Sequence, residues 1–151
     1  MPLSKRTKIL TMSELDYLII VDDDEEDRSL MIDALKESRY SNKYLEMGSG
    51  QELLDHLQQA RDSNSHLPCS IILDYNLRKS NASEILSQLK ANKLFTTIPV
   101  IVLSSSSYTK HRQMLYELGC SCYRHKPSSF NRMVELFNAI EVLWCVSESD
   151  G

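Results

Sequence analysis

The sequence predicts an α/β fold in which helices cover both faces of one doubly wound parallel sheet. From Tyr17 onward, short apolar runs alternate with amphipathic segments of roughly ten to fifteen residues, the pattern of repeated strand-helix units. The chain has 151 residues, room for one domain with its own core. Hydrophobic residues make up 42% and charged residues 25%, which is typical of a globular chain and excludes a disordered one.

Five segments are strand candidates, and their composition predicts their order in the sheet. The first, third and fourth are continuous apolar runs, as expected for strands buried on both faces, whereas the second and fifth are mixed, as expected at an edge. Right-handed crossovers then give the order 2-1-3-4-5, the flavodoxin-like arrangement of a five-stranded parallel sheet. The candidates are 17–22, 44–47, 69–74, 98–104 and 121–125.

Five helices are expected between and after these strands. Four carry one apolar stripe each, at Leu30/Met31/Ala34/Leu35, Leu53/Leu54/Leu57, Ile85/Leu86/Leu89 and Met114/Leu115/Leu118. The fifth carries two stripes, Phe130/Met133/Phe137/Ile140/Trp144 and Leu136/Ala139/Leu143. It has more apolar surface than one sheet face covers, so we expect a homodimer through the fourth helix, the fifth strand and the fifth helix.

The periodicity also predicts the domain limits and excludes several classes of protein. Residues 1–14 read as a flexible N-terminal arm, 15–146 as the domain and 147–151 as a C-terminal tail. No apolar run approaches the roughly 20 residues of a membrane span, and the first residues lack a secretory signal, so we expect a cytoplasmic protein. The net charge of −4 disfavours nucleic acid as a partner.

Polar side chains gather where the predicted strands end. The first strand is followed by the run Asp22-Asp23-Asp24, the third ends at Asp74, the fourth ends at Ser104, and Lys126 follows the fifth. In an open parallel sheet these carboxyl ends meet at one edge, where function gathers. Carboxylates so close together repel one another unless a hard divalent cation lies between them, which predicts Mg²⁺. Metal, lysine and hydroxyl together suit phosphoryl transfer, with Asp74 as the nucleophile.

These residues resemble the receiver domains of two-component response regulators over roughly residues 16–144. The resemblance rests on VDDD at 21–24, IILDYN at 71–76, VIVLSS at 100–105 and Lys126-Pro127. It implies that Mg²⁺ is bound by Asp22, Asp23, Asp74 and the backbone carbonyl of Asn76. It also implies that Asp74 is the phosphoacceptor and that Ser104 and Lys126 contact the phosphoryl group. Finally, it implies a cis peptide bond before Pro127 and a switch formed by Ser104 and Tyr123.

The resemblance also implies what the protein does. A free-standing receiver domain would take its phosphoryl group from a sensor histidine kinase or a phosphotransfer protein, and would then act on a downstream protein. It would be no enzyme beyond catalysing its own phosphorylation and dephosphorylation. The sequence departs from the family after Asp74, where a common pattern has Pro and then Asp-Gly, and this chain has Arg78-Lys79-Ser80-Asn81-Ala82.

Two other classes of protein fit the motifs less well. An aspartate-based phosphatase needs a second Asp two residues after Asp74, where Asn76 stands, and a nucleotide-binding domain needs glycines after the first strand. A pseudo-receiver that binds partners without phosphorylation stays open as the alternative. Residues 24–27 fit the acidic first turn of a helix. We assign His111 and His125 no catalytic role, and we interpret the cysteines as reduced thiols.

Overall fold

A five-stranded parallel sheet forms the centre of the computed structural model, which describes residues 16–105 and 112–150, with side chains up to residue 140. The predicted order is confirmed as β2-β1-β3-β4-β5. The strands are β1 Tyr17–Val21, β2 Lys43–Met47, β3 Ser70–Asp74, β4 Val100–Ser104 and β5 Cys122–His125.

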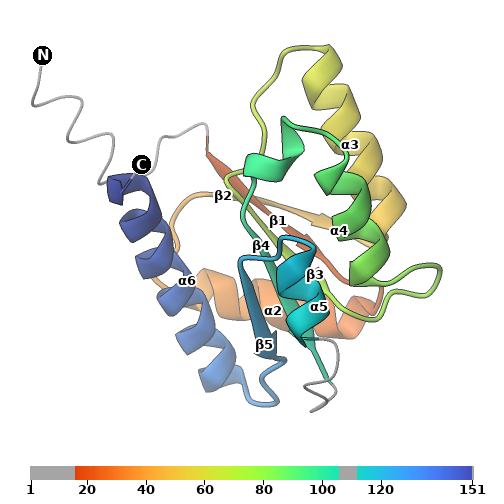
Figure 1. Ribbon diagram of the computed structural model, residues 1–151. Helices are drawn as coiled ribbons and strands as arrows, with labels where there is room; N and C mark the ends of the chain where they lie inside the picture. The colour runs from red at the N-terminus through yellow and green to blue at the C-terminus, as the bar shows by residue number, and fades with distance from the viewer. Residues whose placement is uncertain (1–15, 106–111, 151) are drawn as a thin grey trace, which may run out of the picture.

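Five α-helices cover the two faces of the sheet, as predicted. They are α2 Glu25–Glu37, α3 Gly50–Asp62, α4 Ala82–Lys90, α5 Arg112–Glu117 and α6 Phe130–Asp150, and a 3-10 helix spans Phe95–Thr97. Helices α2 and α6 pack side by side on one face, and α3, α4 and α5 lie on the other (Figure 1). The fold is therefore the doubly wound, flavodoxin-like one.

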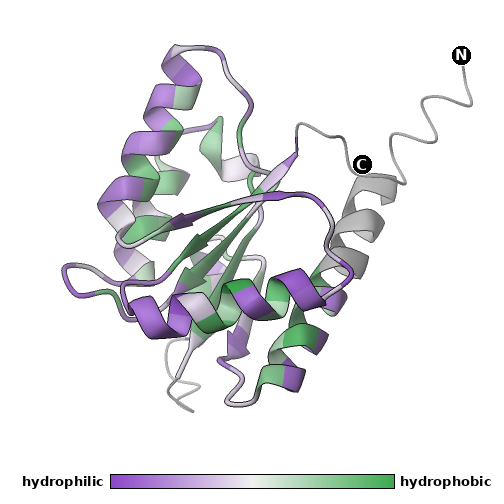
Figure 2. Cartoon of the chain, turned by 180° about the vertical axis from the view of Figure 1, so that it is seen from behind, coloured by the Kyte–Doolittle hydropathy of each residue, from purple (hydrophilic) through white to green (hydrophobic). Residues whose placement is uncertain are grey.

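The core lies in two layers, one on each side of the sheet. Every residue of β3 and β4 is buried, whereas three of the five residues of β2 are exposed. The central strands are accordingly hydrophobic along their length, and the helices turn hydrophilic residues outward (Figure 2). The contrast confirms that strand composition distinguishes central strands from edge strands.

Side-chain caps fix where the helices begin. Asp24 accepts a hydrogen bond from the backbone N–H of Asp27 at 3.0 Å and caps α2, so the acidic run occupies a cap and a first turn. Ser129, which precedes α6, accepts a hydrogen bond from the N–H of Arg132 at 3.3 Å. These caps direct α2 and α6 away from the edge where β1 and β5 end.

Helices α3 and α4 approach each other closely at Gly50. A Cβ atom at this position would lie 2.3 Å from Cδ1 of Ile85, so a larger residue would clash with the neighbouring helix. Gly119 has a φ of 103° just after α5, a left-handed conformation that glycine adopts readily at a helix end. A side chain at Gly50 would force Ile85 to shift, and one at Gly119 would strain the backbone.

The ends of the domain differ from the expected limits on one side. Helix α6 continues to Asp150, beyond residue 146 where we expected the domain to end. The predicted arm 1–14 lies outside the described residues, as does His111. Over the described ranges, no helix combines the length and the apolar character needed to cross a membrane.

Candidate functional site

The carboxyl ends of four strands meet at one edge of the sheet. The register places Val21 beside Leu73 and Asp74 beside Leu103, and Ser104 pairs with His125. Asp22, Asp74, Ser104 and Lys126 therefore lie at this edge, each at the end of a strand or one residue beyond it. The contacts of Lys126 with Asp22 and Asp74 show that these three side chains converge.

Asp22 is fully buried, at 0% exposure, and every part of it is held. Its Oδ1 accepts from the N–H of Asp24 at 2.9 Å, and its Oδ2 accepts from Nζ of Lys126 at 2.6 Å. Its backbone carbonyl accepts from Nη1 of Arg28 at 2.6 Å. A buried carboxylate is tolerated only with such partners, and these contacts hold Asp22 in a fixed position at the bottom of the site.

Lys126 reaches across the edge and contacts three carboxylates. Its Nζ lies 2.6 Å from Asp22, 3.1 Å from Asp27 and 3.5 Å from Asp74. Burial lowers the pKa of this ammonium, but the hydrogen bond to Asp22 and the charge of Asp74 outweigh burial, so its pKa is raised. Lys126 is therefore fully charged at neutral pH.

Asp74 is the carboxylate whose charge is least favoured. Burial raises its pKa from an ordinary value of 3.8 to about 7, the charge of Lys126 opposes that rise, and the charge of Asp22 adds to it. Burial at this position therefore favours the protonated form of Asp74 far more than water does for an ordinary carboxyl. A second positive charge at this edge would keep Asp74 ionised.

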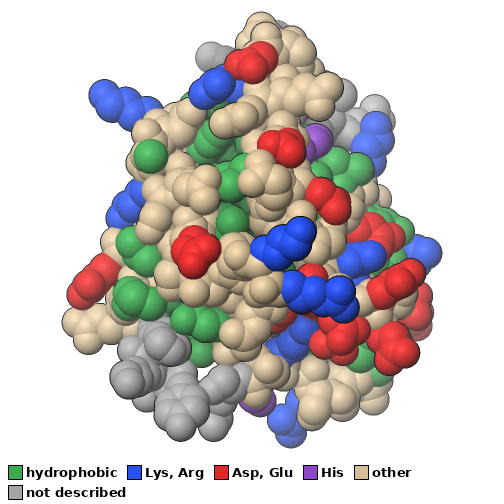
Figure 3. Space-filling view, turned by 90° about the vertical axis from the view of Figure 1, so that its right-hand side faces the viewer, with side chains coloured by type: hydrophobic (Ala, Val, Ile, Leu, Met, Phe, Trp, Pro, Cys, Tyr) green, Lys and Arg blue, Asp and Glu red, His purple; other side chains and the backbone are tan. Residues whose placement is uncertain are grey.

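Asp23 lies on the outer side of the cluster and contacts the loop after β3. Its Oδ2 accepts from the backbone N–H of Arg78 at 2.8 Å and lies 3.6 Å from Nε of the same residue. At one end of the face that carries α3 and α4, acidic and basic side chains gather side by side (Figure 3). The contact ties the β3–α4 loop to the end of β1.

The β3–α4 loop is a short ordered turn. Asn76 and Asn81 form an isolated antiparallel bridge, and the N–H of Leu77 donates to the carbonyl of Ser80 at 3.1 Å. The Asn81 side chain accepts from the N–H of Glu84 at 3.1 Å and caps α4. The turn fixes the backbone around Asn76, whose carbonyl we predicted as a metal ligand.

Ser104 and Tyr123, the predicted switch residues, lie on adjacent strands. Ser104 is 2% exposed, and its carbonyl accepts from the N–H of Lys126 at 2.7 Å. Tyr123 is half-buried and packs against the core on the side of α5. Its backbone N–H donates to the hydroxyl of Tyr116 at 3.0 Å, which links β5 to α5.

One expectation about the backbone is wrong. The described residues contain no cis peptide bond, so the bond between Lys126 and Pro127 is trans. The trans form of an X–Pro bond is favoured by about 0.5–1 kcal/mol, and Lys126 reaches Asp22 and Asp74 from it.

The carboxylates suit a divalent cation in both geometry and charge. Asp22, Asp23 and Asp74 each offer a ligand atom, and the three atoms lie within 4.8 Å of one another. When ionised, these three and Asp27 carry four negative charges against the two positive charges of Lys126 and Arg78. The excess equals the charge of one divalent ion, and hard cations prefer carboxylate oxygens. The cluster therefore fits the predicted kind of metal.

Two members of this cluster were missed from the sequence. Asp27 was assigned only to the first turn of a helix, and Arg78 only to an unusual loop. Asp27 lies in the first turn of α2, only a few residues after the predicted ligands Asp22 and Asp23, and this closeness in sequence was a signal that could have placed it near the site. No comparable signal exists for Arg78, because loop conformation decides its contact.

Two adjacent aspartates after β1, a third aspartate at the end of β3 and a lysine after β5 gather at the carboxyl edge of a parallel sheet, the arrangement of a receiver-type site. The chain belongs to the response regulator receiver domain family, whose family model matches residues 18–138. Receiver domains work in two-component signalling with histidine kinases or phosphotransfer proteins and with downstream targets.

The relatives agree with this assignment along most of the chain. Response regulator Rcp1 of Synechocystis sp. (strain ATCC 27184 / PCC 6803 / Kazusa) is 30% identical over 128 residues, 84% of this chain and 87% of Rcp1. The phosphorylated cyanobacterial phytochrome response regulator RcpA superposes with a TM-score of 0.75 at 28% identity, covering 85% of this chain and 93% of RcpA. The Mn²⁺-bound form of Rcp1 gives a TM-score of 0.73 at 30% identity, covering 86% and 94%.

Proposed function

We propose that this protein accepts a phosphoryl group on Asp74 in a reaction that requires Mg²⁺, and that the phosphorylated form changes a protein-binding face. The observation that carries the proposal is the position of Asp74, within 4.8 Å of Asp22 and Asp23 and 3.5 Å from the ammonium of Lys126. A carboxylate so placed has a cation site on one side and a fixed positive charge on the other. Both favour charge that develops on a transferred phosphoryl group.

The donor in this proposal is a phosphohistidine of a sensor histidine kinase or a phosphotransfer protein. An Asp74 carboxylate oxygen attacks the phosphorus in line, the bond between phosphorus and the imidazole nitrogen breaks, and that nitrogen keeps the electron pair. An acyl phosphate forms on Asp74. Lys126 then shifts its hydrogen bonds from Asp22 toward a phosphoryl oxygen.

A bound Mg²⁺ would neutralise the phosphoryl oxygens and keep the carboxylates ionised. Asp22, Asp23 and Asp74 would hold the ion with the backbone carbonyl of Asn76. The Mn²⁺-bound form of Rcp1 supports this assignment, because it is a similar chain that binds a divalent cation. Tight packing around Asp22 supports it too, since a rigid carboxylate loses little entropy on binding.

Ser104 and Tyr123 form the switch in this proposal. The hydroxyl of Ser104 would turn toward the phosphoryl group, and the ring of Tyr123 would move into the space that Ser104 leaves. The burial of Ser104 and the half-buried position of Tyr123 on the neighbouring strand support this coupling. Tyr123 also borders α5, so its movement would alter the surface there.

The direct test is phosphorylation in the absence of any kinase. The protein is incubated with a small acyl phosphodonor and Mg²⁺, and intact mass is measured. We expect one phosphoryl adduct that is labile at alkaline pH, absent with EDTA and absent in Asp74→Asn. The matched control is Asp33→Asn, a carboxylate on α2 outside the cluster. An adduct that survives Asp74→Asn would contradict the proposal.

The alternative is a pseudo-receiver that binds its partner without phosphorylation. The same experiment separates the two functions, because a pseudo-receiver gives no adduct with any donor. The presence of the complete set Asp22, Asp23, Asp74, Ser104 and Lys126 favours the phosphorylated mechanism.

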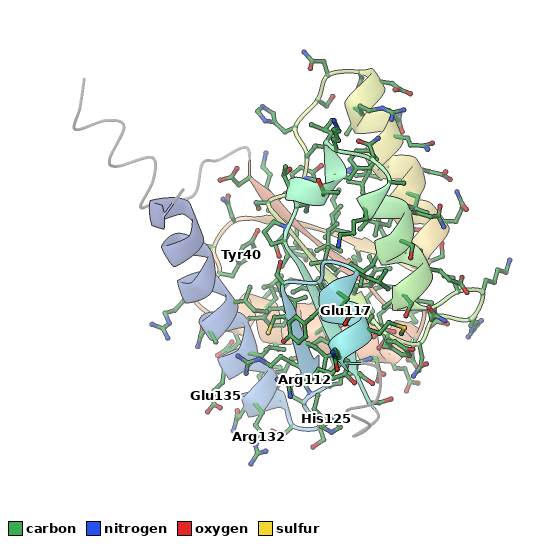
Figure 4. The ribbon with its side chains drawn as sticks, viewed as in Figure 1. Tyr40, Arg112, Glu117, His125, Arg132 and Glu135 are labelled. Carbon is green, nitrogen blue, oxygen red and sulfur yellow. The ribbon has the colours of Figure 1, made fainter. Side chains whose placement is uncertain are left out.

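The downstream face in this proposal comprises α5, β5 and α6. Met114, Tyr116 and Phe130 are exposed there at 38–40%. Charged side chains surround them, with Arg112 and Glu117 on α5 and Arg132 and Glu135 on α6 (Figure 4). This mixture fits a protein partner, and a second copy is the simplest one.

Sedimentation at tens of micromolar, with and without the phosphodonor, tests the homodimer. We expect the phosphorylated form to sediment faster. A monomer under both conditions would eliminate the homodimer and leave a different protein as the target. Trp144 belongs to the predicted dimer face but lies beyond the side chains that the structure describes.

A further inference from the structure

Arg78 makes two different contacts with the proposed metal ligand Asp23. Its backbone N–H donates to Oδ2 at 2.8 Å, which is an ordinary hydrogen bond. Its guanidinium lies farther away, with Nε 3.6 Å from the same oxygen. The main chain therefore holds the carboxylate, and the side chain adds a loosely attached positive charge.

The exposure of the two partners is unequal. The Arg78 side chain is 83% exposed, whereas the Asp23 side chain is 18% exposed. Water solvates the guanidinium well in either position, so leaving Asp23 costs Arg78 little. Asp23 is less solvated and needs a nearby positive charge more.

There is also space into which the guanidinium can move. A cavity of about 420 Å³ adjoins the site and is lined by Asp23, Arg78, Lys79, Ser49 and Gly50, among others. The Arg78 side chain can withdraw along this cavity without displacing packed side chains. A second cation, Lys79, lines the same cavity, but in the part of the chain that the structure describes it forms no ion pair with Asp23.

From these contacts we propose that Arg78 sets the metal affinity of the site by occupying Asp23 as a displaceable counter-charge. A divalent cation that binds Asp23 must displace the guanidinium or bind beside it against its repulsion. Arg78 therefore weakens cation binding, and the backbone N–H keeps the carboxylate oriented in both states. The inference rests on the metal site of the proposed function.

The contact belongs to the part of the loop that departs from the common family pattern. That pattern has Pro in this turn, and a proline has no N–H to donate and no charge to offer. Arg78 supplies both. The departure therefore acts at the proposed metal ligand Asp23. With Arg78 in place, the cation site is weaker and depends more on salt than it would with a neutral residue at position 78.

The test measures cation binding by the unphosphorylated full chain, without any phosphodonor. Mn²⁺ is titrated and its free fraction is followed by electron paramagnetic resonance, and Mg²⁺ is then added as a competitor. The variants are Arg78→Ala and Arg78→Glu, with Lys79→Ala as the matched control that removes the same charge one residue away. All three substitutions are in an exposed loop, so folding is retained.

We expect the dissociation constants of both ions to fall about two- to fivefold in Arg78→Ala and to fall further in Arg78→Glu. Lys79→Ala should change them clearly less. The difference between wild type and Arg78→Ala should shrink at high salt, because the charges are exposed. If Arg78 had only a structural role, the dissociation constants would not fall in step with the charge at position 78.

Three results would overturn the inference, and two of them leave the metal site of the proposed function standing. Saturable binding by wild type with equal or weaker binding by Arg78→Ala would overturn the role of Arg78 alone. Equal tightening in Lys79→Ala would do the same. No saturable binding by wild type would overturn the metal site of the proposed function and this inference with it.

Discussion

At the carboxyl end of the sheet ion pairs join charged side chains, whereas at the amino end hydrogen bonds join neutral groups that are only partly buried. Asp22, Asp74 and Lys126 form a buried ion cluster at the carboxyl end. At the amino end the hydroxyl of Tyr17 lies 2.9 Å from Nε2 of His56 and donates to the carbonyl of His66 at 2.8 Å. Burial lowers the pKa of His56, so this group is neutral at pH 7.

The amino end contributes to the stability of the fold, whereas the carboxyl end is suited to bind a cation. At the amino end these polar groups already have neutral hydrogen-bond partners and need no added ion. The ion cluster at the carboxyl end is satisfied only in part, because its carboxylates outnumber its cations. We therefore expect substitutions at the two ends to differ in size, in sign and in their dependence on a divalent cation.

The largest effect is expected from Lys126→Ala. Removing the ammonium leaves Asp22 buried beside Asp74 without its counter-charge, and breaking a buried pair costs about 3 kcal/mol of the free energy of unfolding. Urea unfolding in EDTA measures the loss. Millimolar Mg²⁺ should restore part of it. The matched control Lys79→Ala removes an exposed charge and should change stability by less than about 0.5 kcal/mol.

The next effect has the opposite sign and depends on pH. The pKa of Asp74 is raised to about 7 in the folded state, so folding favours the protonated form and stability falls as pH rises from about 4 to about 7. The full pKa difference corresponds to at most about 4 kcal/mol, and we expect Asp74→Asn to gain roughly 2 kcal/mol at pH 8 in EDTA.

Urea unfolding of wild type and Asp74→Asn at several pH values checks this expectation. The two proteins should be nearly equal in stability near pH 4 and should diverge up to pH 7. Saturating Mg²⁺ should reduce the gain, because a bound cation stabilises the ionised carboxylate of the wild type. A gain that is independent of pH would show that ionisation of Asp74 is not its cause.

A smaller effect is expected at the amino end from Tyr17→Phe. The variant loses the hydroxyl that bonds to His56 and to the carbonyl of His66, at a cost of about 1 kcal/mol in the free energy of unfolding. Its affinity for Mg²⁺ should equal that of the wild type. A changed metal affinity would mean that the two ends are coupled through β1.

The smallest effect is expected from Glu46→Gln. Glu46 pairs with Nε of Arg28 at 3.1 Å, but its side chain is 46% exposed. An exposed pair contributes little, so unfolding should change by less than about 0.5 kcal/mol. A larger loss would mean that Arg28 needs this partner to hold the carbonyl of Asp22, and Arg28→Ala would then lose at least as much.

The fold and the centre of the site were predictable from the sequence because both follow from strand composition. Continuous apolar runs identified the central strands, and parallel strands end at one edge. The convergence of Asp22, Asp74 and Lys126 could therefore be predicted from their positions at the strand ends. The roles assigned to these three residues and to Ser104 stay predictions.

What could not be predicted depends on the conformation of loops and long side chains. Arg78 contacts Asp23 only because the turn after β3 aims one particular N–H, and hydrophobic periodicity carries no information about such a turn. The three-way contact of Lys126 with Asp22, Asp27 and Asp74 depends on a rotamer of a long side chain. The trans bond before Pro127 was expected to be cis only from resemblance.

The hydrogen bond from the Tyr123 N–H to the Tyr116 hydroxyl has a consequence for aggregation. Strand β5 is an edge strand of four residues, and the open edge of a sheet invites pairing with a strand of another molecule. The bond occupies one of the amides that such a strand would need. Arg124 and His125 are exposed along the same strand. The short, charged and partly capped edge therefore disfavours growth of the sheet from one molecule into the next.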